Sequence, residues 1–217
     1  MIGLIDYGCG NQAHLKMALE AAGYAVYVIK DEFQADEVSP SCLVLPGCGN
    51  FAEVSRNLAS SGLDHWIRRN SENLPIIGIC IGMHILFEGS EEAPDHDGLG
   101  LLKGRVRHLT ALTNVDTSSS SLTLPIMGRH SLHQVESNFR SSRLRDTVFP
   151  SLVYVAHSYA AQSIESGIQT HFLDYGIEQS IPAVVVRDNV TGLQFHPELS
   201  GQEGASLLAS LVAGIDL

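Results

Sequence analysis

A cysteine between two glycines has the neighbours that a catalytic nucleophile needs. Cys80 is flanked by Gly78 and Gly82, after an apolar stretch and before a helical pattern. This is the context of a nucleophile elbow, the strand–turn–helix motif G-x-S-x-G, with cysteine in place of serine. Such a turn strains the backbone of the nucleophile, its glycines give room, and the helix start presents N–H groups to an oxyanion. A buried cysteine between packing glycines is the alternative, and the pentapeptide alone does not decide between them.

A second segment, Gln194-Phe195-His196-Pro197-Glu198, supplies the other groups for cysteine chemistry. If this segment is extended, residues two apart point the same way, so His196 and Glu198 share one face. A thiol needs a base to take its proton, and that base needs a group that holds its tautomer. Histidine and glutamate suit these two roles. Because the chain has ten histidines, His196 alone would more often be structural.

The third segment is the glycine-rich turn that contains Gly47, Cys48 and Gly49 and follows an apolar run. Two glycines let the backbone approach a ligand or flip a peptide, although a plain turn is the alternative. The carboxyl ends of parallel strands converge on one crevice. The three segments are therefore expected to meet there.

The elements that must position these residues alternate between strand and helix in the first half of the chain. The expected strands cover residues 2–5, 25–29, 42–45 and 75–79, with helical patterns at 15–22, 51–70 and 83–87. From about Gly104 the segments are shorter and β-like, at residues 105–109, 153–156, 183–186 and 192–195, before a last helix over 204–212. This order predicts an α/β fold: a single, flavodoxin-like domain over residues 1–217, with a central, mostly parallel mixed sheet flanked by helices. Two domains are the alternative, and the Ser/Thr-rich residues 113–121 are expected to form a mobile loop.

Composition and charge weigh against several classes of function. The formal net charge of −11 disfavours binding to nucleic acid or to an anionic membrane surface. No apolar run approaches the roughly 20 residues of a membrane span, and the N-terminus lacks the basic region of a secretory signal. The four cysteines form no CxxC pair, which disfavours zinc and redox chemistry. We therefore expect a cytoplasmic protein without a metal or another cofactor.

Six segments together resemble the class I glutamine amidotransferases. They are residues 6–11 (DYGCGN), 46–49 (PGCG), the elbow at 78–82, 98–101 (GLGL), 157–159 (HSY) and 196–198 (HPE). The elbow and the His-Pro-Glu segment mark the wider family. The first and the fourth segments are most similar to the glutaminase subunit of imidazole glycerol phosphate synthase, and the resemblance runs from about Ile2 to Leu211.

The resemblance implies a role for each matching position. Cys80 attacks the glutamine carboxamide, His196 moves protons and Glu198 orients the imidazole. Backbone N–H groups of Ile81 and Cys48 form the oxyanion hole. The positions that bind glutamine are Gly47, Gly49, His84, Glu92, Ser158 and Tyr159. Ammonia passes to a (β/α)₈ cyclase subunit, with which the chain forms a heterodimer and which makes imidazole glycerol phosphate and aminoimidazole carboxamide ribotide in histidine biosynthesis. The positions that face this partner are Asn11, Met127, Arg129 and Leu199.

Some positions depart from the family's pattern and leave other functions open. The family usually has glutamine at position 84, Trp-Asn at 129–130 and lysine at 199, whereas this chain has histidine, Arg-His and leucine. A related glutaminase could supply ammonia to another synthase, such as a sugar-amidating enzyme. A γ-glutamyl peptidase or another stand-alone cysteine hydrolase is a further alternative. A non-catalytic binding subunit is the third, against which the presence of Cys80, His196 and Glu198 together weighs.

Overall fold

The computed structural model describes residues 1–8, 12–47, 49–112, 123–133, 147–162, 169–175 and 181–214. Asn11, Cys48 and the Ser/Thr-rich segment 113–121 lie outside these described residues. The predictions made for them, as partner contact, oxyanion donor and loop, therefore stay predictions.

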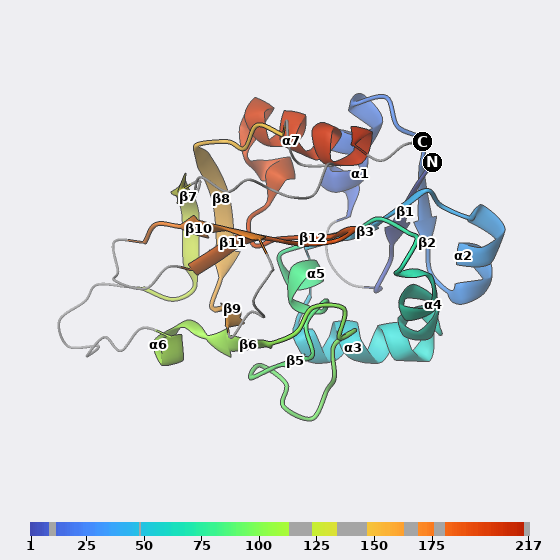
Figure 1. Ribbon diagram of the computed structural model, residues 1–217, viewed down its shortest axis with the longest axis horizontal. Helices are drawn as coiled ribbons and strands as arrows, with labels where there is room; N and C mark the ends of the chain where they lie inside the picture. Colours follow the sequence, from blue (N-terminus) through green and yellow to red (C-terminus); the bar gives the residue numbers. More distant parts are fainter. Residues whose placement is uncertain are drawn as a thin grey trace.

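A nine-stranded mixed sheet runs through the molecule in the order β2-β1-β3-β4-β12-β11-β10-β7-β8 (Figure 1). Its strands are β1 (Ile2–Ile5), β2 (Val26–Ile29), β3 (Cys42–Leu45), β4 (Ile76–Ile79), β7 (Ile126–His133), β8 (Leu152–His157), β10 (Gln169–Leu173), β11 (Ile181–Arg187) and β12 (Val190–Leu193). The neighbours from β2 to β12 are parallel, and those from β12 to β8 are antiparallel. The predicted α/β domain with a mixed sheet is confirmed, with a larger antiparallel share than expected.

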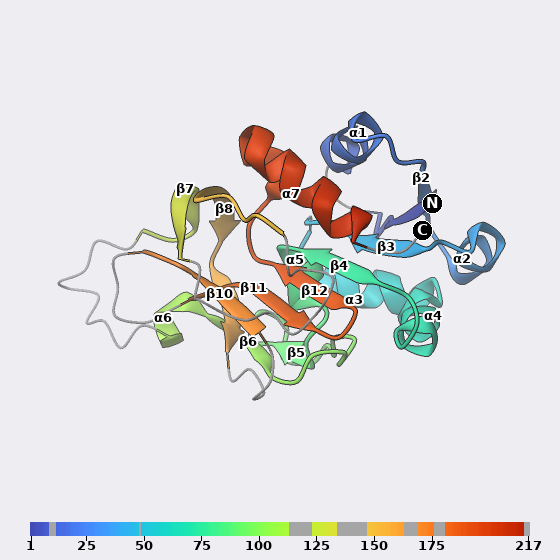
Figure 2. The same cartoon turned by 45° about the horizontal axis from the view of Figure 1, so that its top comes forward.

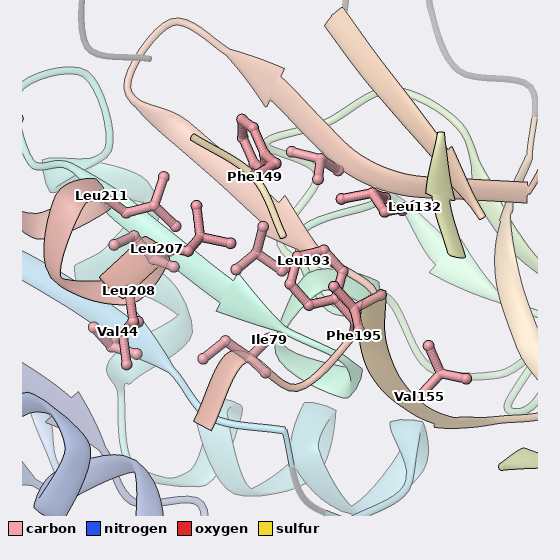
Figure 3. Packing of buried hydrophobic residues seen from close by; sticks show 14 of the residues in the cluster. Val44, Ile79, Leu132, Phe149, Val155, Leu193, Phe195, Leu207, Leu208 and Leu211 are labelled. Atoms are coloured by element: carbon pink, nitrogen blue, oxygen red, sulfur yellow. The ribbon is translucent and has the colours of Figure 1, made fainter. Parts of the chain in front are cut away.

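Helices cover both faces of the parallel half (Figures 1 and 2). They are α1 (Ala13–Ala21), α2 (Glu32–Val38), α3 (Phe51–Ser60), α4 (Leu63–Asn70), α5 (Ile81–His84) and α7 (Gly201–Ala213). A further short helix, α6 (Leu109–Leu112), lies apart from this half, beside residues 105–108 and 159–162. Successive side chains of a strand point to opposite faces. In β1, Leu4 belongs to the core cluster with α1 and α7, whereas Ile5 belongs to the cluster with α3 and α4. Figure 3 shows the first cluster, in which leucines of α7 face Ile79 and Leu193.

A smaller three-stranded sheet stands beside the large one. It consists of β5 (Gly89–Ser90), β6 (Arg105–His108) and β9 (Tyr159–Gln162), in the order β5-β6-β9. Strand β9 starts two residues after the end of β8, so Ser158 alone separates a strand of the large sheet from one of the small sheet. Residues 157–159 therefore lie where the two sheets meet.

The predicted helix over residues 51–70 is wrong in one respect, because it is two helices. Gly62 has a φ of +72° and is the N-cap of α4. A Cβ atom on Gly62 would also lie 2.8 Å from Cδ of Glu32, so glycine suits both the turn and the packing.

The predicted helix after the elbow is shorter than expected. Helix α5 ends at His84, because the carbonyl groups that would continue it accept from a later segment. The Leu99 N–H donates to Ile85 O at 2.6 Å, and the Leu102 N–H donates to Leu86 O at 2.9 Å. Leu86 and Phe87 consequently lie in turns rather than in a helix.

Candidate active site

The backbone at Cys80 has the strained conformation of a nucleophile elbow. Cys80 follows β4 and precedes α5. Its φ of +50° and ψ of −109° are a backbone conformation that residues other than glycine rarely adopt. Both neighbouring glycines are needed for packing. A Cβ atom on Gly78 would lie 2.4 Å from Gly82 O, and one on Gly82 would lie 2.2 Å from Leu45 O. The turn is therefore closed too tightly for any other residue at either position.

His196 lies beside Cys80 because β12 is the parallel neighbour of β4. The Cys80 N–H donates to Leu193 O at 2.7 Å, and the chain reaches His196 three residues later. There, the His196 N–H donates to Tyr154 O of β8 at 2.9 Å. The Ser200 hydroxyl donates to His196 O at 2.6 Å and accepts from the Tyr154 N–H at 2.9 Å. The backbone that carries the imidazole is thus fixed on both sides.

The side chains of Cys80, His196 and Glu198 form one hydrogen-bonded chain. His196 Nδ1 lies 2.8 Å from Glu198 Oε1, and the imidazole also hydrogen bonds to Cys80. Burial alone would lower the pKa of His196, but the hydrogen bonds and charges of Cys80 and Glu198 raise it above its usual value. The imidazole can therefore hold a proton beside a thiolate.

The way Glu198 reaches His196 differs from the expectation. His196 itself is extended, with φ −100° and ψ 98°, but Pro197–Leu199 form a turn of 3-10 helix. The extended face predicted for residues 196 and 198 is therefore wrong, although the two side chains do meet. Proline at the first position of this turn has a fixed φ that suits a helical start. The turn, rather than a strand, points the carboxylate back at Nδ1.

The glycine-rich turn contacts both reacting side chains. A Cβ atom on Gly47 would lie 2.7 Å from Cε1 of His196 and 3.1 Å from Cβ of Cys80. On the other side of Cys80, the N–H of Ile81 donates no backbone hydrogen bond to any described residue, as is usual in the first turn of a helix. Such a free donor next to a nucleophile is what an oxyanion hole requires.

The residues predicted to bind glutamine separate into two groups. Gly49, with φ +88°, precedes α3, whose first N–H, that of Phe51, donates to Glu92 Oε2 at 3.3 Å. Burial raises the pKa of Glu92, and burial followed by the charge of Glu92 raises that of Tyr159. The half-buried Glu92 therefore lies near Tyr159. Ser158 directly precedes Tyr159 in the chain. None of Gly49, Glu92, Ser158 and Tyr159 is fully buried.

His84 belongs to the second group, because its side chain is buried behind the nucleophile. It is 3% exposed, and its Nε2 lies 2.8 Å from Oε1 of Gln194. Gln194 in turn places its amide nitrogen 4.0 Å from Cys80 Sγ. The sequence does not predict Gln194 as a site residue. The only signal in the sequence is that Gln194 lies two residues before His196. Its partner is 110 residues away in the chain.

His157 and Tyr175 are two further residues of the site that the sequence does not predict. The His157 Nδ1–H donates to Tyr159 O at 2.8 Å, so its Nε2 accepts from the hydroxyl of Tyr175. Burial lowers the pKa of His157 to about 3. Burial, followed by the charge of Cys80, raises the pKa of Tyr175. The pair therefore places neutral groups near Cys80.

The residues predicted to face a partner lie near His196. Arg129 of β7 is paired in register with Tyr154 of β8, which forms a bridge to His196. Met127 is 61% exposed and Leu199 is 41% exposed. A Cβ atom on Gly201 would lie 3.9 Å from Nη2 of Arg129, so β7 and the start of α7 are adjacent. Three of the four predicted positions are thus brought together at the surface; the fourth, Asn11, lies outside the described residues.

Within the described part of the chain, no group of three or more His, Cys, Asp or Glu side chains could hold a metal ion. No helix found there is long and apolar enough to cross a membrane. The predicted cytoplasmic location stays a prediction.

Comparison with known proteins identifies similar sequences over almost the whole chain. Residues 3–213 match the family model described as glutamine amidotransferase class-I. The proteins called imidazole glycerol phosphate synthase subunit HisH in Geobacillus thermodenitrificans (strain NG80-2) and Bacillus subtilis (strain 168) are 40% and 38% identical to it over 209 residues. The alignments cover 96% of this chain and 93% of each relative.

Solved structures show the same fold at lower sequence identity. A crystal structure of a glutamine amidotransferase has a TM-score of 0.72 and 16% identity, covering 100% of this chain and 99% of the other. The structure of PurLQS from Thermotoga maritima has a TM-score of 0.71 and 20% identity, covering 98% of this chain and 97% of the other.

Proposed function

This chain belongs to the class I glutamine amidotransferases, and from that premise we propose that it is the glutaminase subunit of an imidazole glycerol phosphate synthase. It hydrolyses glutamine to glutamate and ammonia, and the ammonia passes to a cyclase subunit. The cyclase makes imidazole glycerol phosphate and aminoimidazole carboxamide ribotide in histidine biosynthesis. The observation that carries the chemistry is the hydrogen-bonded chain from Cys80 through His196 to Glu198 at a strained elbow.

The first half of the reaction forms a thioester. The Cys80 thiolate attacks the carboxamide carbon of glutamine while His196 holds the proton. The resulting oxyanion accepts hydrogen bonds from the Ile81 N–H and from an N–H of the Gly47–Cys48 turn. His196 then protonates the departing nitrogen, ammonia leaves, and a γ-glutamyl thioester remains on Cys80. Glu198 keeps Nδ1 protonated throughout, so that Nε2 is the atom that exchanges the proton with sulfur and nitrogen.

The second half of the reaction returns the enzyme to its resting state. His196, now neutral, takes a proton from a water molecule that attacks the thioester carbon. The C–S bond breaks, glutamate leaves, and the imidazolium–thiolate pair forms again. The raised pKa of His196 suits this end state, because it favours a proton on the imidazole beside an anionic sulfur.

Glutamine would be held by the group of residues that remains available to a ligand. The half-buried carboxylate of Glu92 accepts from the Phe51 N–H, and no cationic side chain among the described residues pairs with it. An α-ammonium group would supply that charge. Gly47 and Gly49 let the chain pass close to the substrate, and Ser158 and Tyr159 offer polar groups from the junction of the two sheets. The resemblance also implies that His84 binds glutamine, but its buried position favours support of Cys80 instead.

The partner would dock on the surface formed by Met127, Arg129 and Leu199, together with Asn11. This surface lies one strand away from His196, through the pairing of Arg129 with Tyr154. A partner that covers it could both influence the catalytic residues and receive ammonia directly. The cyclase that we propose has a (β/α)₈ barrel and forms a heterodimer with this chain.

The test is a glutaminase assay of the purified chain with and without an imidazole glycerol phosphate cyclase subunit and its ribotide substrate. We expect ammonia release to rise by about 10²–10³ when the loaded partner is present, the effect of one added oxyanion-hole donor. If the cyclase neither binds nor stimulates, the partner assignment is wrong. Measurable ammonia release by the chain alone would still support the glutaminase activity. The chain would then supply ammonia to another synthase.

A further inference from the structure

A buried hydrogen-bonded pair stands behind the nucleophile and is separate from the Cys80–His196–Glu198 chain. Gln194 Oε1 lies 2.8 Å from His84 Nε2, and Gln194 Nε2 lies 4.0 Å from Cys80 Sγ. Gln194 is 0% exposed and His84 is 3% exposed. His84 comes from α5, immediately after the elbow, whereas Gln194 follows β12. The pair therefore connects the two elements that carry Cys80 and His196.

The direction of these hydrogen bonds determines what faces the sulfur. An amide oxygen only accepts, so the His84 Nε2 that contacts Gln194 Oε1 must carry a proton. With His84 in this tautomer, the amide turns its NH₂ group toward Sγ. In the opposite orientation, the NH₂ group would donate to an unprotonated His84 Nε2, and the amide oxygen would face the sulfur. An acceptor there would disfavour a thiolate, whereas a donor favours it.

We propose that Gln194 donates a hydrogen bond to the Cys80 thiolate and that His84 is a positioning residue that fixes the orientation of the Gln194 amide. The inference rests on the proposed role of Cys80 as the nucleophile. It adds a second source of thiolate stabilisation to that of His196. It also gives a function to the histidine at position 84.

His84 is suited to a fixed orientation because burial holds its pKa at about 4, so that the ring stays neutral near pH 7. A protonated His84 would still donate from Nε2, which means that the amide orientation does not depend on this titration. Among the described residues, the other titratable groups near Cys80 include His196 after β12 with its partner Glu198, His157 of β8 and Tyr175 after β10. None of them is changed in the variants below.

The test is the pH profile of Cys80 alkylation by iodoacetamide, measured on the Cys80 peptide by mass spectrometry in the intact chain. Gln194→Met removes the donor at similar volume, and His84→Phe removes the group that orients it. In both, we expect the midpoint of the profile to rise by about one pH unit and the rate near pH 7 to fall about tenfold. His84→Gln can still donate to Gln194 Oε1, so its profile should stay within about twofold of the parent.

A double variant separates this role from a general effect on folding. Gln194→Met with His84→Phe leaves no buried polar group unpaired between the two positions, so it should be at least as stable as either single variant. Its alkylation should nevertheless be as slow as in Gln194→Met alone, because His84 acts through Gln194. A parental profile in Gln194→Met, or additive effects in the double variant, would overturn the proposal. The proposed function fails separately, if Cys80→Ala still releases ammonia from glutamine.

Discussion

Gly47 lies against the catalytic imidazole: a Cβ atom on this glycine would stand 2.7 Å from Cε1 of His196. The same atom would lie 3.1 Å from both Cys80 Cβ and Ile79 O. The turn after β3 therefore forms one wall of the reacting centre. It also limits where the ring of His196 can move.

We predict that Gly47→Ala lowers kcat for glutamine hydrolysis by about 10², because the methyl group must displace His196 or the backbone at Cys80. Steady-state ammonia release from the variant tests this. The matched control is Gly100→Ala. Gly100 has a φ of +64°, and a Cβ atom on it would meet no other atom within 4 Å, so alanine there strains only a remote turn. Equal kcat losses in the two variants would contradict the account.

We predict unequal effects at the two residues that support the thiolate. His196→Asn removes the proton carrier and should lower kcat by about 10²–10⁴. Glu198→Gln should retain more activity, because its amide oxygen can still accept from Nδ1 of His196. The new NH₂ group would replace Oε2, which has no hydrogen-bond partner among the described residues and so faces no competing donor. The rates of ammonia release by the two variants test this prediction. Comparable activity in His196→Asn and the parent would exclude His196 as the base.

Much of this arrangement could be predicted from the sequence. The β-branched and apolar runs of β1, β3 and β4 stand out because the strands are buried on both faces. The glycines around Cys80 mark the elbow for a local, steric reason. Strand β7 escapes prediction because its side chains alternate between exposed and buried and include several polar residues, so it has no apolar run.

The parts that could not be predicted depend on contacts between distant segments. Helix α5 stops at His84 because residues 99–102 take the carbonyl groups of the next turn. Gln194 has a place in the site only because His84 lies beside it in the folded chain. The sequence shows neither the turn of 3-10 helix that carries Glu198 nor the direction in which its carboxylate points.

We predict that the chain loses stability as the pH falls from about 6.5 toward 4, in part because of His84. Burial holds the pKa of His84 at about 4 in the folded protein, whereas the unfolded chain binds the proton near pH 6.5. The unfolded state thus binds more protons in this window, and stability rises with pH through it. In His84→Gln, the slope of unfolding free energy against pH should be shallower by at most about 1.4 kcal/mol per pH unit. Urea unfolding at several pH values measures the slope, and identical slopes would contradict the burial of a neutral His84.

We predict that Met127→Glu weakens binding of the cyclase subunit at least about tenfold, because it places a charge on an exposed apolar side chain at the proposed interface. The matched control is Phe33→Glu. Phe33 is 79% exposed on α2, at the far edge of the large sheet, and the same change there should leave the affinity unaltered. Titration calorimetry with the purified cyclase measures both. Weaker binding in Phe33→Glu alone would place the interface at the other end of the sheet.

The central claim is that Cys80 forms a covalent intermediate with glutamine, and acid-quenched mass spectrometry of the reacting complex tests it most directly. Glutamine is mixed with the chain and the loaded cyclase, the reaction is stopped in acid, and the peptides are mapped. The account predicts a γ-glutamyl group on the peptide that contains Cys80. It also predicts no adduct and no ammonia release in Cys80→Ala, and both in Cys42→Ala, where a buried core cysteine is changed. A γ-glutamyl group on any other residue, or ammonia release by Cys80→Ala, would contradict it.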